Sequence, residues 1–177
     1  MDDVGAHRKG DIRELYLRAL RNSVPSGWKY TVKVWALPGT GIDPVYWHME
    51  GGLKDPDHDV LVFNKTGNNM PKKDFYLIEF DLQDHSGLGL SFEPNPMNAF
   101  WVAMGNSNSA PPCPTSPSYC DSVYAVSTDS DGGTLTVRND DMEVQMFSFS
   151  LGFISNKDGL HYRYDPGGNN QDGGYSS

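Results

Sequence analysis

The sequence has few basic residues for its size, and this shortage limits the partners that it can hold. Its 177 residues include 14 Lys and Arg against 23 Asp and Glu, which gives a formal net charge of −9 at pH 7. Proteins that bind nucleic acid contact its phosphates with clustered Lys and Arg. The acidic balance therefore predicts that nucleic acid is not a partner.

Long apolar stretches are also missing. A helix that spans a membrane needs about 20 consecutive apolar residues, and the sequence contains no such run. The first 25 residues show no apolar segment followed by small residues, as a secretory signal would have. We expect a soluble chain with no membrane partner and a cytoplasmic location, and secretion stays open because a mature chain would have lost its signal.

Several motifs that carry chemistry do not occur. There is no P-loop, no GxGxxG fingerprint, no HExxH pair and no GxSxG elbow. The sequence therefore predicts no cofactor and no metal site, and it favours a non-enzymatic role without deciding the question.

Only two cysteines are present, Cys113 and Cys120. Both lie in residues 105–121, a Pro- and Ser-rich stretch too polar to pair as a strand and long enough to be a functional loop. A disulfide between them would pin this loop, whereas two free thiols are expected in a reducing compartment. A zinc site is disfavoured because neither cysteine belongs to a CxxC pair.

One helix is expected, near the N-terminus. Residues 1–10 are polar and predict a flexible start, after which Asp11 and Glu14 have the spacing of a capping box. Five apolar residues then recur with helical period and form one stripe, namely Ile12, Leu15, Tyr16, Ala19 and Leu20. The pattern predicts an amphipathic helix over residues 11–23, with Arg13, Arg18 and Arg21 off the stripe.

After Trp28 the apolar period changes to two, which indicates strands. The first strand ends before Pro38-Gly39, and short β-rich runs separated by turn residues follow it. We expect further strands at residues 45–49, 59–63, 74–82, 88–92, 99–104, 122–127, 133–138, 143–153 and 160–164. The fold class predicted is all-β, an antiparallel β-sandwich of about ten strands, Ig-like or jelly-roll-like, with one short N-terminal α-helix.

Two runs look like central strands because they alternate most strongly. In residues 75–82 the side chains of Tyr76, Ile78, Phe80 and Leu82 should share one face. In residues 144–153 the shared face is Phe147, Phe149, Leu151 and Phe153. Val144 and Met146 are out of phase with this face, which a bulge near Met146 would explain. The turn at Asp129–Gly133 fits a hairpin better than a calcium loop. Residues 11–166 are expected to form one domain, and the polar residues 167–177 a flexible tail.

Candidate ligand-binding residues lie around the second expected strand. His48 and Glu50 are two positions apart, so on a strand they share a face and could act as a base with its orienting carboxylate. Trp35 falls on the polar phase of the first strand, and Trp47 neighbours His48. Tryptophan rings beside polar groups are suited to sugar binding, although core packing is their commoner use.

The segments Gly87–Phe92, Ala99–Val102, Cys113-Pro114, Leu135–Asn139, Phe147–Phe153 and Tyr164–Pro166 together resemble a group of small uncharacterised bacterial β-sandwich proteins. The resemblance covers about residues 75–172. It implies a β-sandwich and brings no known activity with it.

Three functions follow as hypotheses. The first is a non-enzymatic binding or assembly module that holds a protein partner or self-associates. The second is a lectin-like carbohydrate-binding domain that uses Trp35 and Trp47. The third is a hydrolase with a His48–carboxylate site.

Overall fold

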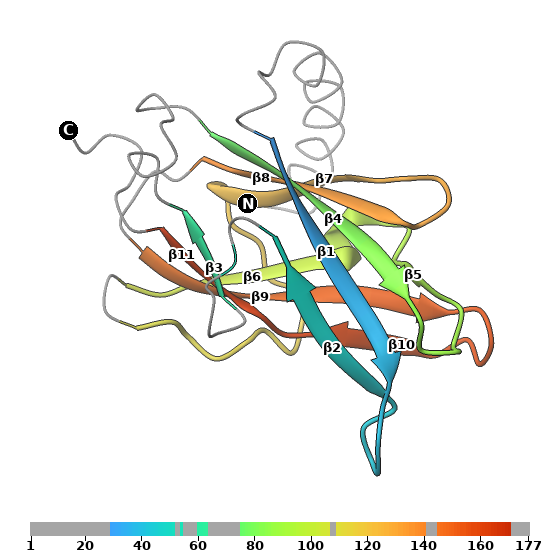
Figure 1. The fold of residues 1–177 in the computed structure, drawn as a ribbon. Coiled ribbons are helices and arrows are strands. Elements are labelled where there is room, and N and C mark those ends of the chain that lie inside the picture. The colour runs from blue at the N-terminus through green and yellow to red at the C-terminus, as the bar shows by residue number, and fades with distance from the viewer. Residues whose placement is uncertain are drawn as a thin grey trace.

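The computed structural model describes residues 29–51, 54, 60–63, 75–106, 109–140 and 145–170. Eleven strands form in these ranges and make two sheets (Figure 1). Their bounds are β1 Lys29–Pro38, β2 Val45–Glu50, β3 Val60–Phe63, β4 Tyr76–Asp84, β5 Leu90–Phe92, β6 Phe100–Met104, β7 Val123–Thr128, β8 Thr134–Asn139, β9 Gln145–Ser155, β10 His161–Tyr164 and β11 Gly167–Asn170. The all-β prediction is confirmed, and each of the ten expected strands has a counterpart.

The first sheet has the strand order β2-β1-β4-β8-β7. Alternation places its apolar side chains inward as predicted, because Val32 and Val34 of β1 and Tyr76 of β4 are fully buried. The turn between β7 and β8 is the hairpin that the sequence predicts. Gly132 adopts a positive φ of 72° there, which glycine tolerates, and the backbone N–H of Gly133 donates to Asp131 Oδ1 at 2.9 Å.

The second sheet is built around β9. On one side β9 pairs with β6 and β5, and on the other with β10 and β11, beyond which lies β3. Strands β10 and β11 keep the same register, since Tyr164 pairs with Leu151 and Gly167 with Ser148. They are therefore two halves of one extended segment, interrupted at Asp165-Pro166 because proline cannot donate a ladder hydrogen bond.

Three details differ from the sequence-based expectation. Residues 167–170 form strand β11 between β3 and β9, where a flexible tail was predicted, and residues 171–177 lie outside the described part. The purely antiparallel arrangement is wrong for two pairs, because β1 runs parallel to β4 and β3 parallel to β11. Pairing between β9 and β11 is continuous through Met146, and the bulge among the described strands lies instead between Ala125 and Ser127.

Helical structure in the described ranges is confined to α2, Pro96–Ala99, within the connection from β5 to β6. Asn95 caps it by accepting a hydrogen bond from the backbone N–H of Met97 at 3.0 Å, and Pro96 starts the turn. The helix predicted over residues 11–23 and the flexible N-terminus predicted over residues 1–10 lie outside the described residues.

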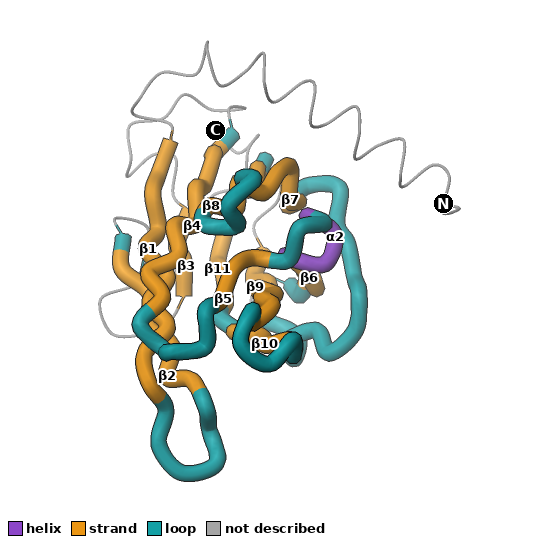
Figure 2. The backbone as a smooth tube through the Cα atoms, turned by 90° about the vertical axis from the view of Figure 1, so that its right-hand side faces the viewer, coloured by secondary structure: helices purple, strands orange, loops and turns teal. Residues whose placement is uncertain are grey.

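The two sheets lie as two layers with their apolar faces toward each other (Figure 2). Aromatic rings from both sheets meet between them: Phe80 of β4 lies 5.8 Å from Phe149 of β9, centroid to centroid. The predicted inward face of β9 is confirmed, since Phe147, Leu151 and Phe153 are also almost completely buried. The two sheets share one core. On each strand, the side chains that alternate with the core residues therefore point outward, and a surface site has to be built from these.

Candidate functional site

The β1–β2 hairpin brings three of the four predicted ligand-binding residues together. Trp35 and His48 are direct partners in the β1–β2 ladder, and Lys33 pairs with Glu50 two positions further on. His48 Nε2 lies 3.5 Å from Glu50 Oε1, and the two side chains are 43% and 56% exposed. The shared face predicted for His48 and Glu50 is confirmed. It is an open strand surface, so water reaches both groups.

Trp35 is held by a second aromatic ring on this surface. Its indole stacks on His85, with ring centroids 5.4 Å apart and planes 20° from parallel. The backbone N–H of His85 donates to the carbonyl of Ala36 at 2.7 Å, which fixes the histidine beside β1. Nε1 of Trp35 is buried and has no hydrogen-bond partner among the described residues. A buried N–H without a partner costs free energy. The Trp35 indole is therefore held in place by its packing on His85 and not by a hydrogen bond of its Nε1.

Trp47 does not belong to this surface. It points to the opposite face of β2, where its ring stacks on Phe153 at 4.7 Å and on Tyr164 at 5.4 Å, centroid to centroid. Successive side chains of a strand alternate between faces, so Trp47 and its neighbour His48 cannot line one site. The structure thus places Trp47 with the core.

The tip of the β1–β2 hairpin carries apolar residues that the sequence analysis did not single out. Ile42 is 98% exposed, and Tyr46 on β2 is 62% exposed and pairs with Leu37 of β1. The tip is closed by hydrogen bonds from Gly39 N to Pro44 O and from Asp43 N to Thr40 O, at 3.1 and 3.3 Å. The sequence shows Ile42 and Tyr46 close to the Pro38-Gly39 turn, but it does not show whether their side chains are exposed or buried.

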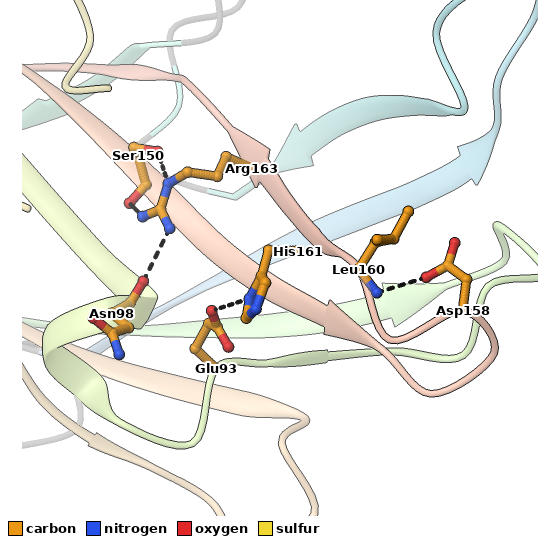
Figure 3. Close-up of polar contacts among 7 residues, drawn as sticks. All are labelled: Glu93, Asn98, Ser150, Asp158, Leu160, His161 and Arg163. Carbon is orange, nitrogen blue, oxygen red and sulfur yellow. Dashed lines mark hydrogen bonds and ion pairs between the residues drawn. The ribbon is translucent and has the colours of Figure 1, made fainter. Parts of the chain in front are cut away.

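A separate polar cluster lies on strand β10 and its neighbours, as Figure 3 shows. His161 Nδ1 lies 2.7 Å from Glu93 Oε2, and the Glu93 side chain is 11% exposed while that of His161 is 65% exposed. The two residues are 68 positions apart, so no local spacing could have predicted this contact. The contact links Glu93, directly after β5, with His161, the first residue of β10.

Arg163 is the most enclosed cation of this cluster. Its Nε donates to Ser150 Oγ at 2.6 Å and its Nη1 to the carbonyl of Asn98 at 3.1 Å (Figure 3). The guanidinium lies 3.3 Å from the ring centroid of Trp101, within cation–π range. Burial lowers the pKa of Arg163 to about 10, and the negative charges of Asp165 and Glu93 oppose that shift. The group stays charged at neutral pH and ties β10 to β9 and α2.

The turn between β9 and β10 has its own carboxylate contacts. Asp158 accepts hydrogen bonds from Leu160 N at 2.8 Å and from the hydroxyl of Tyr162 at 2.7 Å. The hydrogen bond from Tyr162 is the largest cause that lowers the pKa of Asp158, and the same bond raises the pKa of Tyr162.

The loop at residues 105–121 packs along the second sheet. Ser148 Oγ of β9 donates to Pro111 O, and Val102 N of β6 donates to Ser118 O at 3.0 Å. Cys113 and Cys120 are not bonded to each other in the structure, and both are half-buried. Burial, and then the charge of Asp165, raise the pKa of Cys113, which makes its thiol a poor nucleophile at neutral pH. Backbone contacts fasten this loop without a disulfide.

Hollows in the described surface are small. An apolar recess between β6 and β7, lined in part by Met97 and Tyr119, has a cavity volume of about 10 Å³. Sites for small molecules commonly measure about 300–1,000 Å³. The described residues also hold no group of three or more His, Cys, Asp and Glu placed to bind a metal ion.

No protein-family model matches the chain, and no curated protein matches its sequence. Within the ranges that the structure describes, no helix is long and apolar enough to cross a membrane.

Proposed function

We propose that this protein is a non-enzymatic assembly module with a β-sandwich fold, and that it associates with a second copy of itself through the β1–β2 hairpin. The connection between β1 and β2, which is the tip of the hairpin, extends beyond the strands of both sheets at the bottom of Figure 1. A projecting hairpin can contact a partner without any change in the core.

The exposure of Ile42 carries this proposal. An isoleucine that is 98% exposed at the tip of a hydrogen-bonded turn buries no apolar area in the free chain. Burying such a side chain in a complex contributes roughly 1.5–3 kcal/mol. Tyr46 and Trp35 on the adjoining strand surface are of the residue types that dominate binding energy at protein interfaces.

The charges on this surface favour a second copy as partner. Lys33 and Glu50 are both exposed and are partners in the β1–β2 ladder, so one hairpin offers a cation and an anion side by side. A twofold contact uses the same patch on both copies, which lets each lysine meet the other copy's glutamate. Strand β2 is also the edge of the first sheet among the described strands, and an edge offers unpaired backbone groups.

The two other hypotheses have less support. For a carbohydrate site, Trp47 is not available on the surface of Trp35 because it packs against the core. Trp35 lies on the outer surface, but His85 already covers one face of its ring. A hydrolase would need a nucleophile or a held water beside His48, and the described residues offer His48 only Glu50 on an open surface.

The test is sedimentation equilibrium of the full chain over a range of concentrations. The parent should pass from monomer to dimer as its concentration rises. Ile42→Asp places a charge in the interface and should weaken dimerisation about tenfold or more, because losing about 1.4 kcal/mol has that effect.

Leu160→Asp is the matched control. Leu160 is 59% exposed and lies on the turn between β9 and β10, away from the β1–β2 tip. This variant should dimerise like the parent. A parent that stays monomeric at all concentrations, or equal weakening in both variants, would overturn the proposal.

A further inference from the structure

A second apolar cluster lies on the outer side of the first sheet, opposite the core. It consists of Leu77 and Val126, with Phe75 and Tyr124 packed against them, and we call it the outer cluster. Arg138 of β8 pairs with Leu77 and with Tyr124, and its guanidinium lies 4.0 Å from the ring centroid of Phe75. The outer cluster therefore crosses three neighbouring strands, β4, β8 and β7.

This face is buried although it points away from the second sheet. Leu77 is 1% exposed, Val126 is 4% exposed and Thr136, on the same face of β8, is 1% exposed. The second sheet covers the opposite face, and no other described strand or helix lies over β4 and β8 on this side (Figure 2). A side chain in the middle of an open sheet face keeps more contact with water than this, so a further segment must cover it.

The start of β1 indicates which segment this is. Lys29, the first described residue, is the ladder partner of Leu77, so β1 begins beside the outer cluster. Within the part of the chain that precedes β1, residues 11–23 have the single apolar stripe that runs from Ile12 to Leu20. An amphipathic helix is stable mainly when its apolar face is packed against another element.

Length and charge fit the same assignment. A helix over residues 11–23 is about 20 Å long, and strands lie about 4.8 Å apart, so it can cross about four strands. On a helix with 3.6 residues per turn, Arg13 would lie at the border of the stripe, and the outer face of the sheet carries Glu79 and Asp81. A basic side chain at the border of the stripe would then face a sheet surface that carries carboxylates.

The stretches outside the described residues that adjoin β4 and β8 in sequence are poorer candidates. Residues 64–74 directly precede Phe75 in the sequence, but Met70 and Pro71 are their only large apolar residues. Residues 141–144 follow β8 and contribute Met142 and Val144. Neither stretch has a stripe long enough to cover three strands.

We infer that the outer cluster is the docking surface of the chain's own N-terminal segment, and that residues 11–23 pack on it as an amphipathic helix with the Ile12–Leu20 stripe toward Leu77 and Val126. The first sheet is then covered on both faces. This docking is independent of the self-association proposed above, which uses the β1–β2 hairpin.

The test measures access to the outer cluster in the full chain. Val126→Cys is introduced together with Cys113→Ser and Cys120→Ser, and the rate of maleimide labelling is recorded. The new thiol should react slowly, because position 126 is covered. Adding Leu15→Asp puts a charge on the stripe and should raise the labelling rate about tenfold or more, since the covering segment detaches.

Leu17→Asp is the matched control, because Leu17 lies on the same predicted helix but off the stripe. It should leave labelling slow. Fast labelling of Val126→Cys without any change in the N-terminal segment, or equal rates with Leu15→Asp and Leu17→Asp, would overturn the inference.

A cross-link decides the matter even if Leu15→Asp unfolds the protein. In the same serine background, Leu15→Cys with Val126→Cys should form a disulfide within one chain under mild oxidation, whereas Leu17→Cys with Val126→Cys should form little. A bond between two chains, or equal yields from the two pairs, would contradict docking of the stripe in its own chain.

Discussion

The β1–β2 hairpin and the β9–β10 hairpin meet in the core but differ on their outer surfaces. Trp47 of β2 stacks on Phe153 of β9 and Tyr164 of β10, so the two hairpins share one aromatic contact. Outward, the β1–β2 hairpin exposes Ile42 and Tyr46, whereas the β9–β10 hairpin exposes Leu160 and directs Tyr162 and Arg163 into hydrogen bonds.

The difference separates residues that hold the fold from residues that are available to a partner. The polar contacts of the β9–β10 hairpin end on other parts of the same chain, including Glu93 and the carbonyl of Asn98. Ile42 and Tyr46 at the β1–β2 tip are instead exposed to solvent. Substitutions in the two hairpins should therefore affect stability and association separately.

The largest expected effect is at the shared aromatic contact. Trp47→Ala removes a ring that packs against both Phe153 and Tyr164, and it should lower the free energy of unfolding by about 3 kcal/mol. Urea unfolding followed by circular dichroism measures this. A loss below about 1 kcal/mol would show that the two hairpins do not depend on each other.

The next effect tests the polar contacts of the β9–β10 hairpin. Arg163→Met leaves Ser150, which is fully buried, without its donor and should cost about 2 kcal/mol. Lys157→Met on the same hairpin is the control, because Lys157 is exposed, and it should change the free energy of unfolding by less than about 0.5 kcal/mol. Equal losses in the two variants would remove the contrast between the hairpins.

These cases also show how far the sequence predicts the structure. Period-two alternation is a local property, and it placed Ile78, Phe80 and Phe149 in the core correctly. It also placed His48 and Glu50 on one face. Such patterns identify the face of a residue, but they say nothing about what lies opposite it.

The contacts that the sequence did not predict join residues that are far apart in the chain. Arg163 meets Asn98 across 65 positions, and the contact exists only because β10 and the end of α2 both flank β9. Strand β11 was missed for a related reason. Its four residues, Gly167–Asn170, have no apolar pattern, and their pairing follows from the register that β10 has already set along β9.

A smaller loss of stability is expected on the outer face of the β1–β2 hairpin. Trp35→Ala removes the stack on His85 but also removes the buried, unpaired Nε1, so the two effects partly cancel. The free energy of unfolding should fall by about 1 kcal/mol. In sedimentation equilibrium the same variant should dimerise less than the parent, whereas Arg163→Met should not. Loss of dimerisation in Arg163→Met would place the interface on the other hairpin.

The smallest effect concerns the pH dependence of the β9–β10 turn. The pKa of Asp158 is lowered mainly by the hydroxyl of Tyr162, so its contribution to stability is present above the pKa of the unfolded carboxyl, about 3.9, and is lost as the pH falls through the folded value. The pKa of Tyr162 is raised, so its contribution is present below about 10 and is lost as the pH rises through the folded value.

Tyr162→Phe should therefore flatten both the acid and the alkaline limbs of a plot of urea midpoint against pH. Tyr46→Phe removes a hydroxyl from the exposed face of the other hairpin and serves as the control, whose plot should follow the parent. If Tyr162→Phe kept both slopes, the Asp158 contact would not operate in solution. The contrast between the two hairpins would then rest on the hydrogen bonds of Arg163 and on the contact between His161 and Glu93.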